Sequence, residues 1–540
     1  MNQDTASLPL TEMEKNKSGN GLLITGLIVA MLFAALENTI VGTAMPKIVG
    51  ALGGLEMMTW LTTAYMLTST AIVPIAGKLA DLLGRRMVYL SGIIIFIVGS
   101  ALCGIATTMD QLIYFRALQG LGGGIMMPMA MIIIGDIFTG AQRAKWQGVF
   151  GGIFAFASVV GPQVGGWIVD SLNWSWVFYI NMPVGALAFV FIALGLKSHK
   201  VTGPIKFDVL GMFTMLVGVV SLLLALTFGG TEYAWGSWQI ISLFVLAIIG
   251  LVAFIFVENR AEEPILPMHL FKNRTFTLLN GIGFFLSLGM FGAIMFVPLF
   301  MQGIVGISAT DSGMVMTPMM FAMILTSILS GQLVRKIGIR IQMIVGMAIA
   351  SFGFYLLSTM TIETTKLQAS TDMVILGLGM GLVMPLLTLA LQESFPKSEL
   401  GVVTSSSQFF RQIGGTFGMT ILGTVMNQKS STLLTEQLVP TLEKLPPQAH
   451  EMVVKMEDLV ANNPQGLYSM LLSPESMSKI PATMQNMLVP ILKGTLVDTL
   501  QIVFLVGLAF IIAGLAFTPF VKNIKLSTED KESPEEKKAS

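Results

Sequence analysis

Apolar runs of about 20 residues recur from one end of the chain to the other, each long enough to cross about 30 Å of hydrocarbon. Only 11% of the 540 residues are charged, whereas soluble chains are nearer about 25% charged. This excludes a water-soluble globule and a disordered chain. Because a helix satisfies its own backbone hydrogen bonds in lipid, the runs predict an all-α integral membrane protein.

Hydropathy predicts fourteen transmembrane spans. They lie near residues 21–44, 57–76, 87–106, 111–135, 146–168, 174–195, 207–229, 238–257, 275–299, 311–333, 340–359, 367–391, 402–426 and 497–520. Short loops after even-numbered spans carry most of the lysine and arginine, whereas those after odd-numbered spans carry only Lys47 and Lys366. By the positive-inside rule, we expect a multi-pass protein of the cell (plasma) membrane with both termini in the cytoplasm.

Charge and composition exclude several classes of function. Lysine plus arginine (31) balance aspartate plus glutamate (31), so no global charge points to nucleic acid. The single cysteine, Cys103, excludes an internal disulfide framework, and three unclustered histidines make no metal site. No phosphate-binding G-x-x-x-x-G-K-[ST] loop occurs, so we expect no ATPase, no enzyme activity and no cofactor. Energy would come from an ion gradient or from the substrate gradient.

One repeat relates the two halves at an offset of roughly 255 residues. The segment 77–86 after the second span returns as 331–340 after the tenth span. Glycines of the fourth and fifth spans return in the twelfth and thirteenth: Gly120, Gly122 and Gly124 as Gly377, Gly379 and Gly381, and Gly148, Gly161 and Gly165 as Gly401, Gly414 and Gly418. The offset equals eight spans, which predicts six spans, two inserted spans and six more. Parallel repeats of this kind are typical of secondary transporters.

The predicted organisation has five parts. They are a cytoplasmic tail (1–20), an N-terminal six-helix bundle (21–200), two inserted spans (201–274), a C-terminal six-helix bundle (275–520) and a second cytoplasmic tail (521–540). Residues 427–496 interrupt the last bundle on the outer face. We expect them to form an outer cap or hairpin; a partner-binding or substrate-gating role is the alternative.

Glu37 is the acidic residue that most needs an explanation, since it lies midway along the first span. A charge at that depth costs about 2.5–3.5 kcal/mol on insertion scales, so we expect Glu37 to face a cavity or a partner. A carboxyl group that takes up and releases a proton as a cavity opens to either side would couple transport to a proton gradient. The alternative is a glutamate that serves packing alone.

Two arginines lie in later spans. Arg116 near the start of the fourth span must find an acid, a carbonyl or water, because its charge cannot be removed. It could tune the proton affinity of Glu37 if the two helix faces meet, or it could reach the outer headgroups. Arg411 in the thirteenth span raises the same question.

Two glycine-containing segments predict close helix contacts. The fifth span contains Gly148, then Gly161, Pro162, Gly165 and Gly166, a kinked and tightly packed pattern that could seal a cavity. In the loop after the second span, Gly77, Asp81, Arg85 and Arg86 are candidates for an inner gate, since the charged residues can pair with neighbouring span ends. Ordinary positive-inside topology would account for the two arginines only.

These motifs resemble the major facilitator superfamily, and within it the fourteen-span drug:proton antiporters that include quaternary-ammonium exporters. Residues 77–86 resemble the loop motif, 112–124 the fourth-span motif whose arginine is associated with proton transfer, 148–166 the antiporter motif and 36–46 the first-span signature. Trp60, Tyr65 and residues 174–183 are similar to the fourteen-span branch. The resemblance implies a major facilitator fold of two six-helix bundles plus two inserted spans.

The chain departs from the family pattern at three positions. Glu37 replaces the commoner aspartate, Leu82 stands in place of a basic residue and Ala157 in place of a glycine. We find no second convincing mid-membrane acid in spans nine to fourteen, which argues against dicationic substrates.

We therefore expect a proton-coupled antiporter that exports lipophilic drugs, with cations favoured. Glu37 and Arg116 would couple protons, and Glu37, Trp60, Tyr65, Met127 and Phe154 would line the substrate cavity. Small lipophilic molecules and the bilayer are the expected partners, and we expect a monomer. The alternatives are a dedicated exporter of one endogenous, anionic metabolite and a transport-inactive sensor or scaffold.

Overall fold

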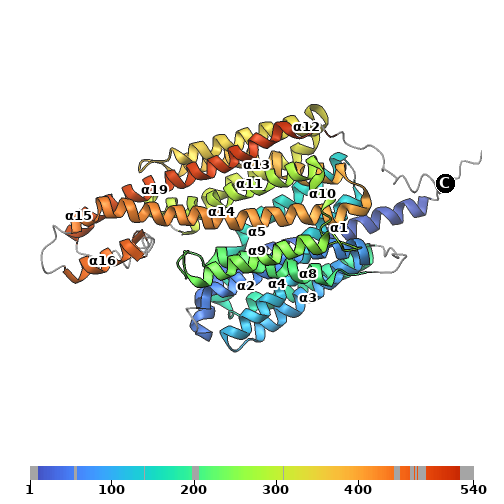
Figure 1. Ribbon diagram of the computed structural model, residues 1–540, viewed down its shortest axis with the longest axis horizontal. Coiled ribbons are helices and arrows are strands. Elements are labelled where there is room, and N and C mark those ends of the chain that lie inside the picture. The colour runs from blue at the N-terminus through green and yellow to red at the C-terminus, as the bar shows by residue number, and fades with distance from the viewer. Residues whose placement is uncertain are drawn as a thin grey trace, which may run out of the picture.

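The computed structural model describes residues 10–53, 57–138, 140–196, 206–230, 232–307, 309–442, 450–462, 467–468, 471, 482–522 and 524. Residues 1–9 and most of 521–540 of the predicted tails lie outside the described residues, whereas residues 10–20 belong to the first helix. Within the described ranges the chain is almost entirely helical, and two bundles lie side by side along the long axis of the molecule (Figure 1). Eleven of these helices are long and apolar enough to cross a membrane. The predicted all-α membrane fold is confirmed.

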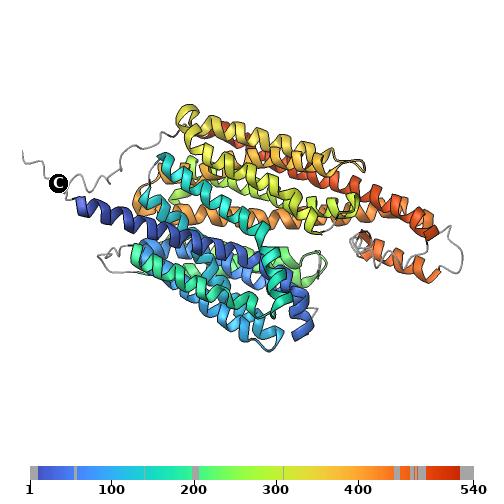
Figure 2. The ribbon, with the colours of Figure 1, turned by 180° about the vertical axis from the view of Figure 1, so that it is seen from behind.

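The N-terminal bundle packs around α4. Its helices are α1 (Leu10–Leu52), α2 (Met58–Leu83), α3 (Arg85–Ile105), α4 (Met109–Ile137), α5 (Gly140–Ser171), the short α6 (Trp176–Tyr179) and α7 (Asn181–Gly195). Helix α4 packs against α2 and α3, and α1 packs against α5 and α7. In Figure 2 the dark blue α1 and the cyan α5 lie toward the viewer.

The C-terminal bundle repeats these pairings. Its helices are α11 (Arg274–Phe300), α12 (Ala309–Ser358), α13 (Lys366–Ser394), α14 (Leu400–Gln437) and α19 (Ala482–Phe517), with the short α10 (His269–Lys272) before them. Helix α13 packs along both parts of α12, and α11 packs against α14 and α19. The two bundles meet where α14 packs on α2 and where α12 packs on α5.

The count of fourteen spans stays a prediction. Helix α12 contains two expected spans in one continuous element, bent at Gly338, whose φ of 77° a glycine tolerates without strain. Gly84 has a φ of 89° at the corresponding end of α2, so the repeat includes these turns. Helices α5 and α14 are absent from the eleven, and α14 carries many polar residues along its length.

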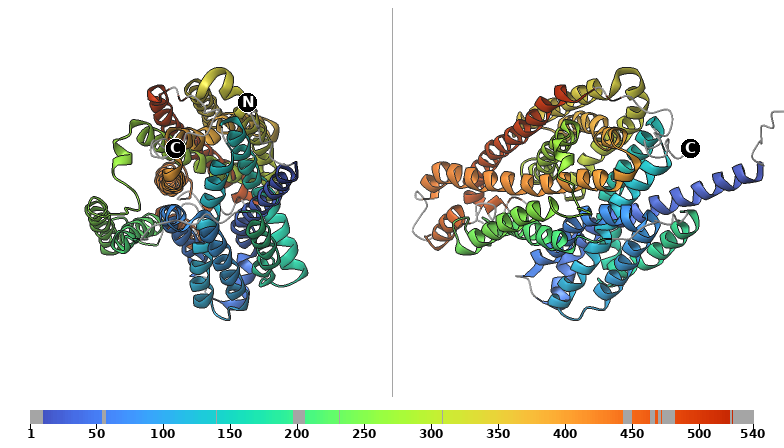
Figure 3. Two further views of the ribbon diagram at one scale, coloured as in Figure 1. Left: turned by 90° about the vertical axis from the view of Figure 1, so that its right-hand side faces the viewer. Right: turned by 45° about the vertical axis from the view of Figure 1, so that its right-hand side comes forward.

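The inserted helices α8 (Val209–Phe228) and α9 (Trp238–Glu258) pair with each other and stand at the flank of the molecule (Figure 3). Helix α8 begins where the Asp208 carboxylate accepts the backbone N–H of Gly211 at 2.8 Å, which caps the helix. Its other end contacts both bundles: Phe228 packs on Trp60 of α2, and Thr420 of α14 donates to the carbonyl of Leu226 at 3.1 Å.

Helices continue beyond the expected membrane boundary in the outer segment. Helix α14 runs to Gln437 and α19 begins at Ala482, and the two pack against each other. At 38 residues and about 1.5 Å per residue, α14 is roughly 57 Å long, nearly twice the hydrocarbon thickness. The short α15 (Val439–Leu442) and α16 (His450–Asn462) lie at this far end (Figure 1). The described part of residues 427–496 thus forms a helical hairpin.

Candidate functional site

Glu37 of α1 and Arg116 of α4 form an ion pair inside the N-terminal bundle. The Nη1 group of Arg116 donates to Glu37 Oε1 at 2.6 Å. Each residue is only 1% exposed. Such a pair is stable only when its remaining polar atoms find partners too, because both charges have left water. Arg116 does not reach the headgroups, so that alternative is wrong.

Three polar residues complete the pair. Asn181, the first residue of α7, donates from Nδ2 to Glu37 Oε2. Gln119 accepts from Arg116 at 2.7 Å and donates to Ser100 of α3 at 2.7 Å. We call Glu37, Ser100, Arg116, Gln119 and Asn181 the acid cluster; it joins α1, α3, α4 and α7, and all five residues are buried.

Sequence reasoning did not nominate the three uncharged members as site residues. One local signal was available, because Gln119 follows Arg116 by three residues and so shares its helix face. Asn181 lies 144 residues after its partner Glu37 in the sequence. Ser100 lies 81 residues before its partner Asn181. Only the packing of α3 and α7 on α1 brings them to the acid.

Tyr65 of α2 closes one side of the acid cluster. Its ring centroid lies 4.4 Å from the guanidinium carbon of Arg116. The negative face of an aromatic ring stabilises a cation at this distance. Arg116 Nε also donates to the backbone carbonyl of Leu61 at 3.3 Å, one turn earlier on α2. Helix α2 thus takes part in holding the arginine.

Two of the other residues expected in a substrate cavity make their described contacts with partners outside the acid cluster. Trp60 packs on Phe228 of α8, with ring centroids 4.8 Å apart. The sulfur of Met127 accepts a hydrogen bond of 3.4 Å from the side-chain amide of Gln408 on α14. The side chain of Phe154 lies outside the described residues. Their role as cavity residues stays a prediction.

Asp81 at the end of α2 binds the first turn of α14. Its Oδ2 accepts the backbone N–H of Val402 at 3.1 Å. A carboxylate there satisfies an amide that has no partner in its own helix and interacts favourably with the positive end of the helix dipole. Arg85 holds the arrangement, 2.9 Å from Asp81 and 3.0 Å from Asp136. Two predicted gate residues therefore meet at a contact between the bundles.

The other two predicted gate residues have different positions. A Cβ built on Gly77 would run into the side chain of Ser405 and the carbonyl of Gly401, so α2 and α14 touch backbone to backbone there. Arg86 instead donates to the carbonyl of Ala193 at 2.7 Å, within the N-terminal bundle. Gly77 thus serves the contact between bundles, whereas Arg86 anchors the end of α7.

A buried ion pair joins α5 and α13 beside this contact. Arg143 lies 2.9 Å from Glu393, and the side chains are 5% and 1% exposed. One turn away, Gln147 donates to Gln392 at 2.9 Å. The sequence alone predicts neither of these contacts, because Arg143 is there only one of the positive loop charges that set the topology. The bundles are therefore sealed together at the end where the loops after α2 and α4 lie.

The glycines of α5 divide between two partners. Gly148 faces α12, where an added Cβ would lie 2.8 Å from the carbonyl of Ser327. Gly161 and Gly165 face α1, where an added Cβ would run into the hydroxyls of Thr39 and Thr43. Gly148 therefore lies in the contact between the bundles, whereas Gly161 and Gly165 allow α5 to pack on α1 beside Glu37. An added Cβ on Gly166 meets nothing within 4 Å, and the side chain of Pro162 lies outside the described residues.

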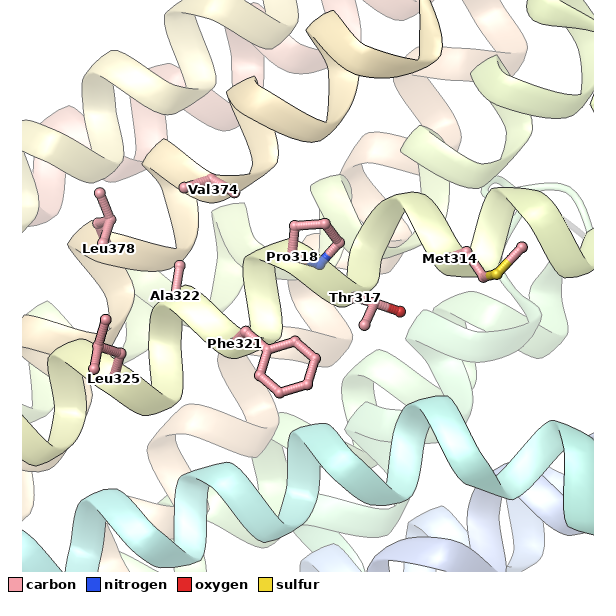
Figure 4. Close-up of a pocket in the computed structure, with 8 residues that line it drawn as sticks. All are labelled: Met314, Thr317, Pro318, Phe321, Ala322, Leu325, Val374 and Leu378. Carbon is pink, nitrogen blue, oxygen red and sulfur yellow. The ribbon is translucent and has the colours of Figure 1, made fainter.

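An apolar pocket of about 800 Å³ lies on α12 and α13. Figure 4 shows its lining: Met314, Thr317, Pro318, Phe321, Ala322 and Leu325 from α12, with Val374 and Leu378 from α13. None of these side chains is charged. The pocket therefore suits an apolar molecule and contains none of the residues nominated from sequence.

Comparison with known proteins gives consistent matches. The family model described as Major Facilitator Superfamily matches residues 27–419. The chain is 66% identical over 524 residues to the multidrug transporter protein MdtP of Bacillus subtilis, covering 97% of each chain. It is 40% identical to multidrug resistance protein 3 of the same organism, covering 77% of this chain and 81% of the relative. Among solved structures, the human organic anion transporter MFSD10 matches with a TM-score of 0.57 at 12% identity, covering 91% of this chain and 99% of that one.

Proposed function

This chain belongs to the Major Facilitator Superfamily, and on that premise we propose that it exports lipophilic drugs in exchange for protons. The expected family is thereby confirmed, as is the multi-pass membrane fold. Drug export is supported by the two Bacillus relatives, whose names describe multidrug transport and resistance. We further propose that export is coupled to protons by antiport, and that the protein lies in the cell membrane with both termini in the cytoplasm.

The observation that carries proton coupling is the buried acid cluster. Among the described residues, Glu37 has a single charged partner, Arg116, and both are buried. Two charges in a low-dielectric interior stabilise each other only while they stay together. Any movement of α1 against α4 that separates them makes uptake of a proton by Glu37 the cheaper state. Helix movement and protonation are therefore linked.

The seal between the bundles supplies the second requirement, alternating access. The Asp81–Val402 and Arg143–Glu393 contacts close the end that we expect in the cytoplasm. In this state a substrate would exchange with the opposite side. We propose that protonation of Glu37 accompanies the opening of these contacts, and that the proton gradient is the only energy source, without a cofactor.

A second candidate is export of one endogenous, anionic compound. Arg411 favours it, because this arginine lies in the C-terminal bundle with neutral partners only among the described residues. Its consequences are taken up in the next subsection.

The test uses inside-out membrane vesicles with an acidified lumen and a quenched pH probe. Adding a panel of lipophilic cations, then anions, should restore fluorescence with the unaltered protein, as protons leave in exchange for substrate. Glu37→Gln should abolish the response, because the amide cannot carry a proton.

Glu363→Gln is the matched control, since it makes the same chemical change at an exposed loop position. It should behave as the unaltered protein does. Substrate-driven fluorescence that survives in Glu37→Gln would remove Glu37 from coupling and leave the exporter standing. No response to either panel, together with no efflux from intact cells, would contradict the exporter itself.

A further inference from the structure

Arg411 differs from the buried Arg116 and Arg143 in having no acidic partner among the described residues. Arg116 and Arg143 lie 2.6 Å and 2.9 Å from carboxylate oxygens. Within the described residues, no carboxylate lies within 4.0 Å of the Arg411 guanidinium. A guanidinium group keeps its charge in proteins, so Arg411 introduces a positive charge that the described protein does not balance.

The groups that hold Arg411 are all neutral acceptors. Nη1 donates to the hydroxyls of Thr388 and Ser407, each at 3.2 Å, and Nη2 donates to the amide oxygen of Gln408 at 2.6 Å. A guanidinium group has five N–H donors. The N–H of Nε and one N–H of Nη2 therefore have no acceptor in the described part of the chain. Donors on these two adjacent atoms match the oxygens of one carboxylate.

The position of Arg411 suits a ligand that lies between the bundles. Arg411 lies eleven residues after the start of α14, about 16 Å along the helix. This is near the middle of the thirteenth span that hydropathy predicts. Its partner Gln408 also contacts Met127 of the N-terminal bundle at 3.4 Å. The side chain is partly exposed, whereas its partners Thr388 and Ser407 are buried. The guanidinium is therefore held by buried neutral groups of α13 and α14.

The acid cluster sharpens the charge argument. Glu37 is already neutralised by Arg116 in this state, so its charge is not available to attract a cation. Arg411, in contrast, carries a positive charge whose partners among the described residues are all neutral. Because a charge in a low-dielectric interior is costly until it is paired, an anionic group supplied by a ligand is strongly favoured there.

We propose that Arg411 binds the carboxylate, or another oxyanion, of an amphiphilic ligand whose apolar body lies between the two bundles. The inference rests on the proposed export function and adds a substrate class to it: lipophilic molecules with an anionic head, zwitterions included. A drug and an anionic lipid share this chemistry, and the experiment separates them.

The experiment measures binding of three fluorescent probes to the purified full-length protein in phosphatidylcholine nanodiscs. The probes share one apolar body and differ only in the head: pyrenebutyrate, its neutral amide, and pyrenebutylamine. Fluorescence polarisation gives the dissociation constant of each. The unaltered protein should bind the carboxylate at least about tenfold more tightly than the amide, the factor that corresponds to about 1.4 kcal/mol.

Arg411→Gln should abolish this preference while binding of the amine stays within about twofold, which shows that the variant is folded. Lys429→Gln removes a positive charge from an exposed position of the same helix and should leave the preference intact. If Arg411→Gln binds none of the probes, Arg411→Lys decides, because it keeps the charge and should restore preference for the carboxylate.

The proposal is overturned by equal binding of carboxylate and amide to the unaltered protein, by a preference that survives in Arg411→Gln, or by its absence from Arg411→Lys. Adding phosphatidylglycerol to the nanodiscs identifies the source of the anion. Competition that depends on Arg411 shows that a lipid headgroup uses the site, and its absence assigns the site to soluble amphiphiles. Binding is measured without a proton gradient, so failure here leaves drug:proton exchange untouched, and the reverse also holds.

Discussion

At the residue scale, Arg116 and Arg411 differ in the groups that surround them. Arg116 is enclosed by an acid, an amide and an aromatic ring, all buried. Arg411 is enclosed by two hydroxyls and an amide. Among the described residues, the same residue type thus has an acidic partner in one bundle and only neutral partners in the other. Under the two proposals above, the first arginine serves proton coupling and the second binds a ligand.

Breaking the buried pair should be costly. Arg116→Leu leaves Glu37 as an uncompensated buried charge and should destabilise the protein by about 3–5 kcal/mol. The double variant Glu37→Gln, Arg116→Leu should recover most of that loss, because neither side chain then carries a charge. The measurement is denaturant unfolding of the protein in detergent, as a double-mutant cycle.

Lys429→Leu, at an exposed position of α14, is the control and should change stability by less than about 0.5 kcal/mol. A double variant as unstable as the sum of its two singles would show that the two charges do not interact.

At the scale of elements, several glycines lie where two helices come into close contact. Gly401 of α14 lies against the carboxylate of Asp81, and Gly161 of α5 lies against Thr39 of α1. The first contact joins the bundles and the second lies within one bundle. A methyl group at the two positions should therefore have different effects.

Gly401→Ala should loosen the seal between α2 and α14. The new Cβ would occupy the space of the Asp81 carboxylate, so the first turn of α14 must move away. A cysteine at Ser406, which is 1% exposed, should then react faster with a maleimide. The background is low because the only native cysteine, Cys103, is buried. Gly423→Ala on the same helix meets nothing within 4 Å, and it should leave labelling unchanged.

Gly161→Ala should instead disturb the packing of α5 on α1 next to Glu37. Overpacking of this kind costs about 1–3 kcal/mol, and drug-driven proton release from vesicles should fall with it. Thr39→Ala, which removes the opposing hydroxyl, should rescue part of both losses. Gly151→Ala is the control, because its Cβ meets nothing within 4 Å; equal damage from both alanines would contradict the packing argument.

These contacts also mark what sequence could predict. Periodic apolar runs and repeated glycines were sufficient for the membrane fold and the two related bundles, whereas the contact of Glu37 with Arg116 was one of two alternatives that the sequence left open. They could not reveal that Asn181 completes the cluster or that Glu393 pairs with Arg143 across 250 residues. Such partners depend on which helix faces meet, and a polar residue in a span gives no sign of its neighbour.

At the scale of the whole molecule, movement between the bundles is the central expectation. The contacts of Asp81, Arg143 and Gln147 with the C-terminal bundle lie at one end. Rigid bundles that rock would have to break all of them together. Holding them closed should therefore stop transport without unfolding the protein.

A disulfide between Gly148→Cys and Ser327→Cys provides such a lock. The two Cβ atoms would lie 2.9 Å apart, below the roughly 3.5–4.5 Å of natural disulfides, so α5 and α12 must move slightly apart. The single variant Gly148→Cys requires the same movement, because its Cβ lies 2.8 Å from the carbonyl of Ser327. Oxidation should abolish drug-driven proton release from vesicles, and reduction should restore it. Each single cysteine variant is the control and should respond to neither treatment. Full transport by the oxidised double variant would contradict rocking at this contact.

The inserted helices make the two junctions between the bundles different from each other. Helix α8 packs on both α2 and α14, and Lys78 of α2 lies 2.6 Å from Glu263 in the loop after α9. That junction between the bundles is covered, whereas the opposite junction, α5 with α12, borders the apolar pocket on α12 and α13. For a molecule dissolved in the surrounding lipid, the two junctions between the bundles are therefore not equivalent. The junction of α5 with α12 is the one that it could approach without meeting the inserted helices.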